Sequence, residues 1–279
     1  MIDLSKISSN LSLAADGVWY GAEQREVSYP SEGNQACFQI EDSSFWFNHR
    51  NECIVSAVRA LPPAKHGAIF DIGGGNGFVS LGLIRAGFDA VLVEPGHLGA
   101  ANAKKRGIST VVCATAETAG FSSASLDAVG LFDVIEHTDD DGQFLQSIRR
   151  LLKPGGRLYA TVPAYSVLWS KEDELAGHFR RYTCKSIADS IGRAGFKLDY
   201  ATYIFRPLPL PILLLRAIPH RLGYTGTVDN TRQAANDHRP AGGVASRALA
   251  WMLNRELGNI ASRRSMAFGG SCMVVATAN

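Results

Sequence analysis

The sequence predicts an α/β fold built on a doubly wound, mostly parallel, seven-stranded sheet, with an N-terminal helical extension and a helical insertion before the last strand. Three observations support this. Short apolar runs alternate with helical patterns from residue 67 onward, as expected for βαβ units. Glycines follow several helical patterns, where they suit C-caps. A glycine-rich turn directly follows the first apolar run, as in ligand-binding parallel sheets.

The predicted elements follow one another at regular spacing. The predicted strands are residues 68–72, 90–94, 110–114, 126–135, 157–163, 196–204 and 266–278. The predicted helices are residues 78–87, 98–107, 141–152, 184–194 and 248–260. Thr183 is a suitable N-cap for the fourth helix, and the turn at 153–156 (KPGG) should separate the third helix from the next strand. The pattern predicts three parts: an N-terminal helical cap (1–63), a ligand-binding core (64–204 plus 265–279) and a cap or insertion (205–264).

The composition excludes several classes of protein. A net charge of +2 gives no broad basic field, which argues against a nucleic-acid partner. Five scattered cysteines without CxxC spacing favour reduced thiols and a cytoplasmic location over disulfides or a zinc site. The longest apolar segment, 203–218, contains Arg206 and three prolines and is too interrupted to span a bilayer.

The turn after the first predicted strand reads FDIGGGNGF, with Gly73, Gly75 and Gly77 at every second position. A dinucleotide turn reads GxGxxG, but its third glycine would fall on Phe78. A carboxylate at Asp71 would repel a pyrophosphate, whereas it would attract a ligand that carries an ammonium and a sulfonium. The turn therefore favours S-adenosylmethionine over NAD.

Glu94 ends the second predicted strand and suits two hydrogen bonds to ribose hydroxyls. NAD sites use the same device, so Glu94 alone leaves both cofactors open. An NAD-dependent oxidoreductase on the same sheet is the alternative that Asp71 and Phe78 argue against. A scaffold that binds the cofactor without catalysis is a second alternative.

Several stretches together resemble the class I S-adenosylmethionine-dependent methyltransferases. They are FDIGGGNGF, VLVEPG, LFDVIEH and LKPGGRLYATVPA, while FGGSCMVVATA fits the closing strand. The segments SFWFNHRN (44–51) and VPAYSVLWSKEDELAGHFRRYT (162–183) are similar to a group of small-molecule methyltransferases, distant relatives of the ubiquinone-biosynthesis enzymes. The resemblance implies a Rossmann-like methyltransferase core over residues 40–204 and the last strand.

The resemblance also implies which residues bind the cofactor. The three glycines and Asp71 would surround its amino acid part, Glu94 with Pro95 its ribose, and Thr115 with Ala116 its adenine. Relatives often have Asp-Ala where this chain has Thr115 and Ala116, so Thr115 would act through its hydroxyl. Asp133, Glu136 and His137 would lie beside the sulfonium. Trp46 and Phe47 either cover the cofactor as a lid or pack a helix by its aromatic face.

The acceptor side is predicted from residues 163–183. A histidine side chain suits general-base catalysis, so His178 is the first candidate for the base, and His137 is the second; structural hydrogen bonding is the alternative for both. Arg180, Arg181 and Tyr182 could bind an anionic group of the substrate, although Arg181 could instead pair with Glu172 or Asp173. We expect no metal, with a site at Glu136 and His137 as the alternative.

These observations together predict an enzyme that transfers a methyl group from S-adenosylmethionine to a small molecule, most simply to an oxygen. The apolar, proline-rich start of 205–264 fits a cap over an apolar or lipid-like acceptor. Plain packing and a homodimer interface are the other uses of this segment.

Overall fold

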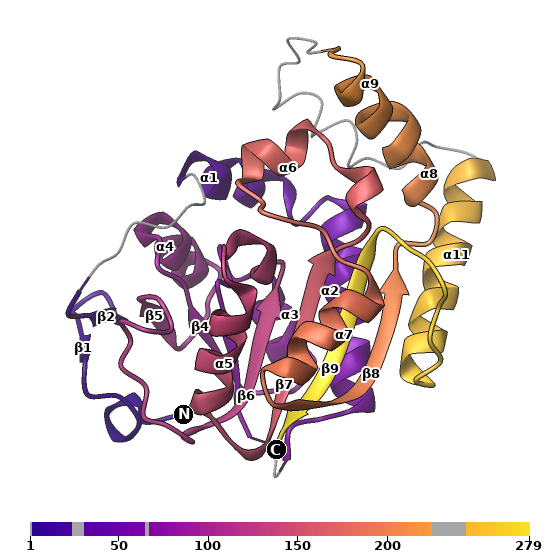
Figure 1. Cartoon of the computed structure of the whole chain (residues 1–279). Coiled ribbons are helices and arrows are strands. Elements are labelled where there is room, and N and C mark those ends of the chain that lie inside the picture. Colours follow the sequence, from indigo (N-terminus) through magenta and orange to yellow (C-terminus); the bar gives the residue numbers. More distant parts are fainter. Residues whose placement is uncertain (1, 24–30, 65–66, 225–243) are drawn as a thin grey trace.

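The computed structural model describes residues 2–23, 31–64, 67–224 and 244–279, and its centre is a nine-stranded sheet in the order β1-β2-β5-β4-β3-β6-β7-β9-β8 (Figure 1). The strands from β2 to β7 in this order run parallel, and β9 lies antiparallel between β7 and β8. The strands are β1 (Leu11–Leu13), β2 (Val18–Gly21), β3 (Ile69–Ile72), β4 (Ala90–Val93), β5 (Val111–Cys113), β6 (Leu126–Phe132), β7 (Leu152–Pro163), β8 (Phe196–Ile204) and β9 (Ser271–Ala278).

Helices cover both faces of this sheet. The α-helices are α1 (Ser31–Ile40), α2 (Phe45–Ala60), α3 (Phe78–Arg85), α4 (His97–Lys105), α5 (Asp141–Leu151), α6 (Lys171–Ala176), α7 (Cys184–Arg193), α8 (Pro209–Ile212), α9 (Ile218–Arg221) and α11 (Val244–Ala261). Short turns of 3₁₀-helix are η1 (Leu4–Lys6), η3 (Ile135–His137) and η4 (Ser166–Leu168), whereas η5 (Leu213–Ala217) is a π-helical turn.

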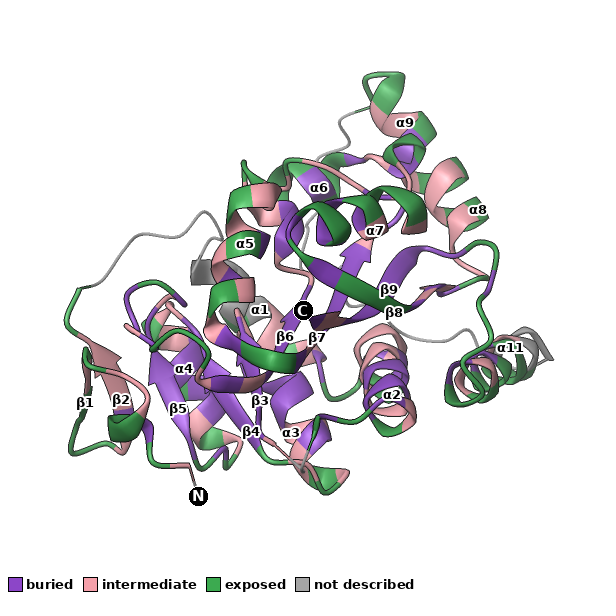
Figure 2. Ribbon diagram, turned by 60° about the horizontal axis from the view of Figure 1, so that its bottom comes forward, coloured by how far each residue is buried: buried purple, intermediate pink, exposed green. Residues whose placement is uncertain are grey.

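The core consists of two large apolar layers, one on each face of the sheet. α5 and α7 pack on one face, and α2, α3 and α11 pack on the other. The strands between these layers are buried along most of their length, whereas the helices expose their outer faces (Figure 2). A sheet covered on both sides needs near-continuous apolar strands, which is why the strand pattern could be predicted from the sequence.

The seven predicted core strands are present, but the N-terminal region is not all helical as expected. Residues 11–21 form the hairpin β1–β2, and β2 extends the sheet by pairing in parallel with β5. Val18 is buried in a small apolar cluster with residues of α4 and β5, which explains why the hairpin joins the sheet. The expected turn at 153–156 is also incorporated into β7, which begins at Leu152 with an irregular register.

Within the segment 205–264, residues 209–221 and 244–261 are helical, while residues 225–243 of this predicted cap lie outside the described residues. α6, α8 and α9 lie above the carboxyl ends of the central strands, whereas α11 packs against α2 (Figure 1). Within the described ranges, no helix has the length and apolar character that crossing a membrane requires. Successive strands are added in one direction from β3 to β4 and β5, and in the opposite direction from β6 to β7. The switch point between β3 and β6 is where such parallel sheets bind ligands.

Candidate active site

A cavity of about 1170 Å³ opens at the carboxyl ends of β3, β4, β5 and β6. The glycine turn and the end of β4 form its floor, α2 forms one wall, and α8 with η5 forms another. Of the predicted site residues, fourteen line it: Trp46, Phe47, Asp71, Gly73, Gly75, Glu94, Pro95, Thr115, Ala116, Asp133, Glu136, His137, His178 and Arg181. The topology therefore brings most of the predicted cofactor and acceptor residues into one space.

The glycine turn meets the cavity through Gly73, Gly74, Gly75 and Asn76. Gly73 and Gly75 have φ angles of +71° and +54°, which side chains rarely adopt. A Cβ on Gly73 would lie 2.8 Å from Val134. The turn thus presents bare backbone to the cavity.

Gly77 has a different role from the one predicted. It is the N-cap of α3 with a φ of +78°, and a Cβ there would contact Ala103 at 3.0 Å. It is absent from the cavity wall formed by the described residues. Gly77 therefore allows α3 and α4 to pack closely and does not line the cavity.

Two buried carboxylates lie under the turn. Ser80 donates its hydroxyl to Asp71 Oδ2 at 2.7 Å, while Asp71 Oδ1 has no hydrogen-bond partner among the described residues. Glu94 accepts the backbone N–H groups of Gly75 at 2.9 Å and of Gly96 at 2.8 Å. Burial raises the pKa of Asp71 to about 6 and that of Glu94 to about 7.

These carboxylates fit the predicted cofactor. An orphaned buried carboxylate oxygen at Asp71 requires a donor such as an ammonium group. Glu94 spans the turn and the end of β4, and each carboxylate oxygen that accepts one backbone N–H can accept a further hydroxyl. The residues therefore suit the amino acid and ribose ends of S-adenosylmethionine, the group that the resemblance implies.

The structure gives less support to the predicted adenine contact of Thr115 than to the predicted contacts of Asp71 and Glu94. Thr115 and Thr118 cap one another, because each hydroxyl accepts the other residue's backbone N–H at 3.0 Å. The two hydroxyls also lie 3.1 Å apart. The Thr115 hydroxyl is therefore occupied locally, although the residue lines the cavity.

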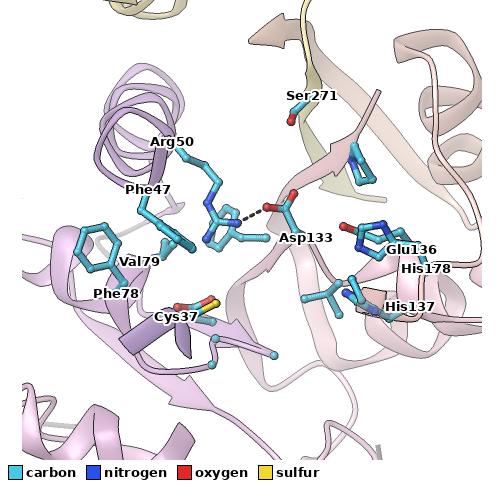
Figure 3. Close-up of a pocket in the computed structure, with 18 of the residues that line it drawn as sticks. Cys37, Phe47, Arg50, Phe78, Val79, Asp133, Glu136, His137, His178 and Ser271 are labelled. Atoms are coloured by element: carbon cyan, nitrogen blue, oxygen red, sulfur yellow. Dashed lines mark hydrogen bonds and ion pairs between the residues drawn. The ribbon is translucent and has the colours of Figure 1, made fainter. Parts of the chain in front are cut away.

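Arg50 of α2 is a cavity residue that was not selected from the sequence. Its guanidinium forms an ion pair with Asp133 across the cavity (Figure 3) and lies 4.8 Å from the Trp46 ring centroid. Asp133 has a φ of +57° and also accepts the Thr161 hydroxyl at 3.0 Å. Trp46 stacks on Phe205 at 5.5 Å, so it both lines the cavity and packs α2 against the chain after β8.

His178 lies on the acceptor side of the cavity and is held by Asp173 of α6. Its Nδ1 lies 2.8 Å from Asp173 Oδ1. Arg181 binds the same carboxylate through two N–H groups, at 2.7 Å and 2.9 Å. Of the two acidic partners expected for Arg181, Glu172 and Asp173, the carboxylate it binds is that of Asp173.

The expectation that Arg180 and Tyr182 contact the substrate is corrected. Arg180 pairs with Asp141 at 3.3 Å, and the Tyr182 hydroxyl donates to Asp141 at 3.0 Å. Tyr182 is buried in the core, and neither residue belongs to the described cavity wall. Adjacent residues of an extended segment point to opposite sides, so Arg181 faces the cavity while its two neighbours face α5.

Glu136 and His137 of η3 lie beside His178 (Figure 3). The Glu136 carboxylate is fully buried, and neither oxygen accepts a hydrogen bond from a described residue. Burial, reinforced by Asp133, raises the pKa of Glu136 well above its usual range, and burial with His178 nearby lowers that of His137 to about 4. His137 is therefore neutral near pH 7.

Ligand atoms of Glu136, His137 and His178 all lie within 4.8 Å of one another. One carboxylate oxygen and two imidazole nitrogens form a donor set that fits a divalent cation. The alternative of a metal at Glu136 and His137 is therefore compatible with the geometry, with His178 as a third donor.

Comparisons with known proteins identify the class of the fold. Residues 70–160 match the family described as methyltransferase domain. The chain aligns over 91% of its length with a structure titled as the complex between the Haloferax volcanii Trm112 methyltransferase activator and the putative methyltransferase, covering 99% of that chain with a TM-score of 0.58 at 16% identity. Residues 70–160 are thus similar to a methyltransferase domain, and the chain has the fold of class I S-adenosylmethionine-dependent methyltransferases.

Curated relatives match parts of the chain. An uncharacterized methyltransferase of Mycobacterium tuberculosis is 30% identical over 144 residues, which cover 50% of this chain and 52% of the relative. The ubiquinone biosynthesis O-methyltransferase of Azorhizobium caulinodans is 29% identical over 170 residues, covering 54% of this chain and 67% of the relative. The chain thus spans about half the length of the Mycobacterium relative.

Proposed function

We propose that this protein transfers the methyl group of S-adenosylmethionine to an oxygen of a small molecule that carries an apolar part. The observation that most supports this is that one continuous cavity of about 1170 Å³ joins the glycine turn to His178 and to the apolar wall of α8 and η5. Pockets for one ligand typically measure about 300 to 1000 Å³, so this space accommodates a cofactor with an acceptor beside it.

The bound cofactor supplies a methyl group that is already activated on a sulfonium. The residues of this chain then have to bind and align the reactants and exclude water from them. Asp71 and Glu94 hold the amino acid and ribose ends, and Arg50 offers the cavity a cation. Alignment of a nucleophile about 3 to 3.5 Å from the methyl carbon can contribute roughly 7 to 11 kcal/mol.

His178 serves as the general base in this proposal. It lines the acceptor side of the cavity and is oriented by a buried carboxylate. The apolar wall consists of Leu208, Pro211, Ile212 and Leu215, which suits a hydrocarbon portion of the acceptor. The name of the Azorhizobium relative, an O-methyltransferase, favours oxygen as the methylated atom.

The test is transfer of radiolabelled methyl from S-adenosylmethionine to a matched set of acceptors. The set contains a phenol with an alkyl tail, the same phenol already O-methylated, and an amine with the same tail. We expect label on the free phenol alone, and none with the Glu94→Gln variant. Label on the amine alone would contradict O-methylation. Cofactor binding without any transfer would favour the non-catalytic scaffold.

A further inference from the structure

Asp173 is a buried carboxylate that does not line the cavity itself but binds two residues that do, His178 and Arg181. Its side chain has no exposed surface. It accepts hydrogen bonds from His178 Nδ1, from two N–H groups of Arg181, and from the backbone N–H of Ser170 at 2.9 Å. Both carboxylate oxygens are therefore engaged, which fixes the plane of the carboxylate.

The charge state of Asp173 decides what His178 presents to the cavity. Asp173 accepts two hydrogen bonds from the charged guanidinium of Arg181 and one from the backbone N–H of Ser170, which keeps its carboxylate ionised. An ionised carboxylate only accepts hydrogen bonds, so its contact with the ring requires a proton on Nδ1. A neutral His178 then carries its lone pair on Nε2, the nitrogen a base would use.

The position of the ring is also restrained through the backbone. The N–H of His178 donates to the carbonyl oxygen of Asp173 at 2.9 Å, so ring and main chain are tied to the same residue. The next N–H, that of Phe179, donates to the carbonyl of Glu136 at 2.8 Å, which joins this loop to η3. These bonds hold the ring against the cavity beside His137, with the two ring centroids 4.8 Å apart.

We propose that Asp173 is a positioning residue that fixes His178 in the tautomer with Nδ1–H and a free Nε2 facing the acceptor, while Arg181 orients the Asp173 carboxylate. The inference rests on the proposed function, in which His178 is the base. The acceptor oxygen forms a bond to the methyl carbon as the sulfur–carbon bond breaks, and that electron pair stays on sulfur. The acceptor proton moves to Nε2, and the imidazolium is stabilised by Asp173.

The tautomer can be measured without knowing the acceptor. Long-range ¹H–¹⁵N spectra of histidine-labelled protein at pH 8, with S-adenosylhomocysteine bound, report which ring nitrogen is protonated, and His178→Gln assigns the signal. We expect a protonated Nδ1 and a bare Nε2, with a second tautomer appearing in Asp173→Asn because an amide can also donate. A proton on Nε2 in the wild type, or an unchanged signal in Asp173→Asn, would overturn the proposal.

Kinetics with the acceptor that takes label separate this inference from the proposed function. A positioned base contributes about 10²- to 10⁴-fold, so Asp173→Asn should lower kcat by about 10- to 100-fold with little change in S-adenosylhomocysteine affinity. In a His178→Ala background Asp173→Asn should cause no further loss, whereas an independent structural role would make the two losses multiply. Glu174→Gln, an exposed change on the same helix, is the matched control.

The outcomes distinguish the two claims. Unchanged turnover in His178→Ala would remove the base and the positioning role together. Loss of turnover in His178→Ala with normal turnover in Asp173→Asn would leave the proposed function standing and contradict the positioning role alone.

Discussion

Replacement of Glu94 by Gln should make the ligand-free protein more stable and at the same time remove cofactor binding. Burial raises the pKa of Glu94 from 4.5 to about 7, so the folded protein disfavours the charged form. The charged Glu94 lowers the free energy of unfolding by the full amount at pH values above the pKa of Glu94 in the folded protein. This loss of stability disappears at pH values below the pKa of Glu94 in the unfolded protein. The ionised Glu94 therefore lowers the stability of the ligand-free protein at pH 8.

The magnitude follows from the shift. A difference of about 2.5 pKa units corresponds to roughly 3 kcal/mol. Gln can accept only one of the two backbone N–H groups that Glu94 now binds, which costs about 1 kcal/mol. The net gain at pH 8 is about 2 kcal/mol, or a rise in Tm of about 4 to 8 °C for a chain of this size.

A thermal shift assay measures both effects. S-adenosylhomocysteine at 100 times its Kd adds about 2.7 kcal/mol to the wild type, and we expect no such gain in Glu94→Gln because an acceptor for the ribose is lost. At pH 4 the charge penalty is nearly absent and only the lost hydrogen bond remains, so the ligand-free variant should be less stable than the wild type by about 1 kcal/mol. A ligand-free variant that is less stable than the wild type at pH 8, with its ligand response intact, would refute the assignment of Glu94.

Three further predictions concern other parts of the structure. Because burial raises the pKa of Asp71 to about 6 and that of Glu94 to about 7, affinity for S-adenosylhomocysteine should fall as calorimetry is repeated from pH 8 to pH 5; a flat profile would contradict charged carboxylates in the site. Glu256 accepts the backbone N–H groups of Phe205 and Arg206 and pairs with His49 at 2.9 Å. Glu256→Gln should therefore lower the free energy of unfolding, measured in urea, by about 3 kcal/mol. A loss below about 1 kcal/mol would refute the view that these buried contacts stabilise the fold. EDTA should leave methyl transfer unchanged, whereas loss of transfer that is restored by a divalent cation would identify Glu136, His137 and His178 as a metal centre.

Much of the sheet could be predicted because its strands are buried on both faces. β3 (Ile69–Ile72) and β4 (Ala90–Val93) are buried at every position and occur where the sequence indicated them, as does the Thr183 N-cap of α7. The hairpin β1–β2 could not be predicted in this way, because its strands have only three and four residues and show little alternation. Its place depends on pairing with β5, about ninety residues away in the chain, which local patterns do not reveal.

The cofactor side of the site was more predictable than the acceptor side. Gly73, Gly75 and Glu94 follow from a turn and a strand end whose geometry is local. Gly77 was misassigned because spacing alone does not tell whether a glycine faces a ligand or a neighbouring helix.

The acceptor side depends on tertiary contacts. Arg50 lies in the segment SFWFNHRN, four residues after Trp46, and this spacing could have pointed to it as a site residue. Its ion pair with Asp133, by contrast, could not be predicted from the sequence. The alternation of residues 180–182 could have separated Arg181 from its neighbours had this segment been treated as extended. The role of Asp173 depends on a contact with His178 across a helix end, which only the structure provides.

The central claim is that the turn after β3 binds a positively charged methyl donor and not a diphosphate. Isothermal titration calorimetry of the purified protein with S-adenosylmethionine, S-adenosylhomocysteine and NAD tests it directly. We expect one site for each of the first two ligands, lost in Asp71→Ala, and no heat from NAD. Binding of NAD without binding of S-adenosylmethionine would contradict the account.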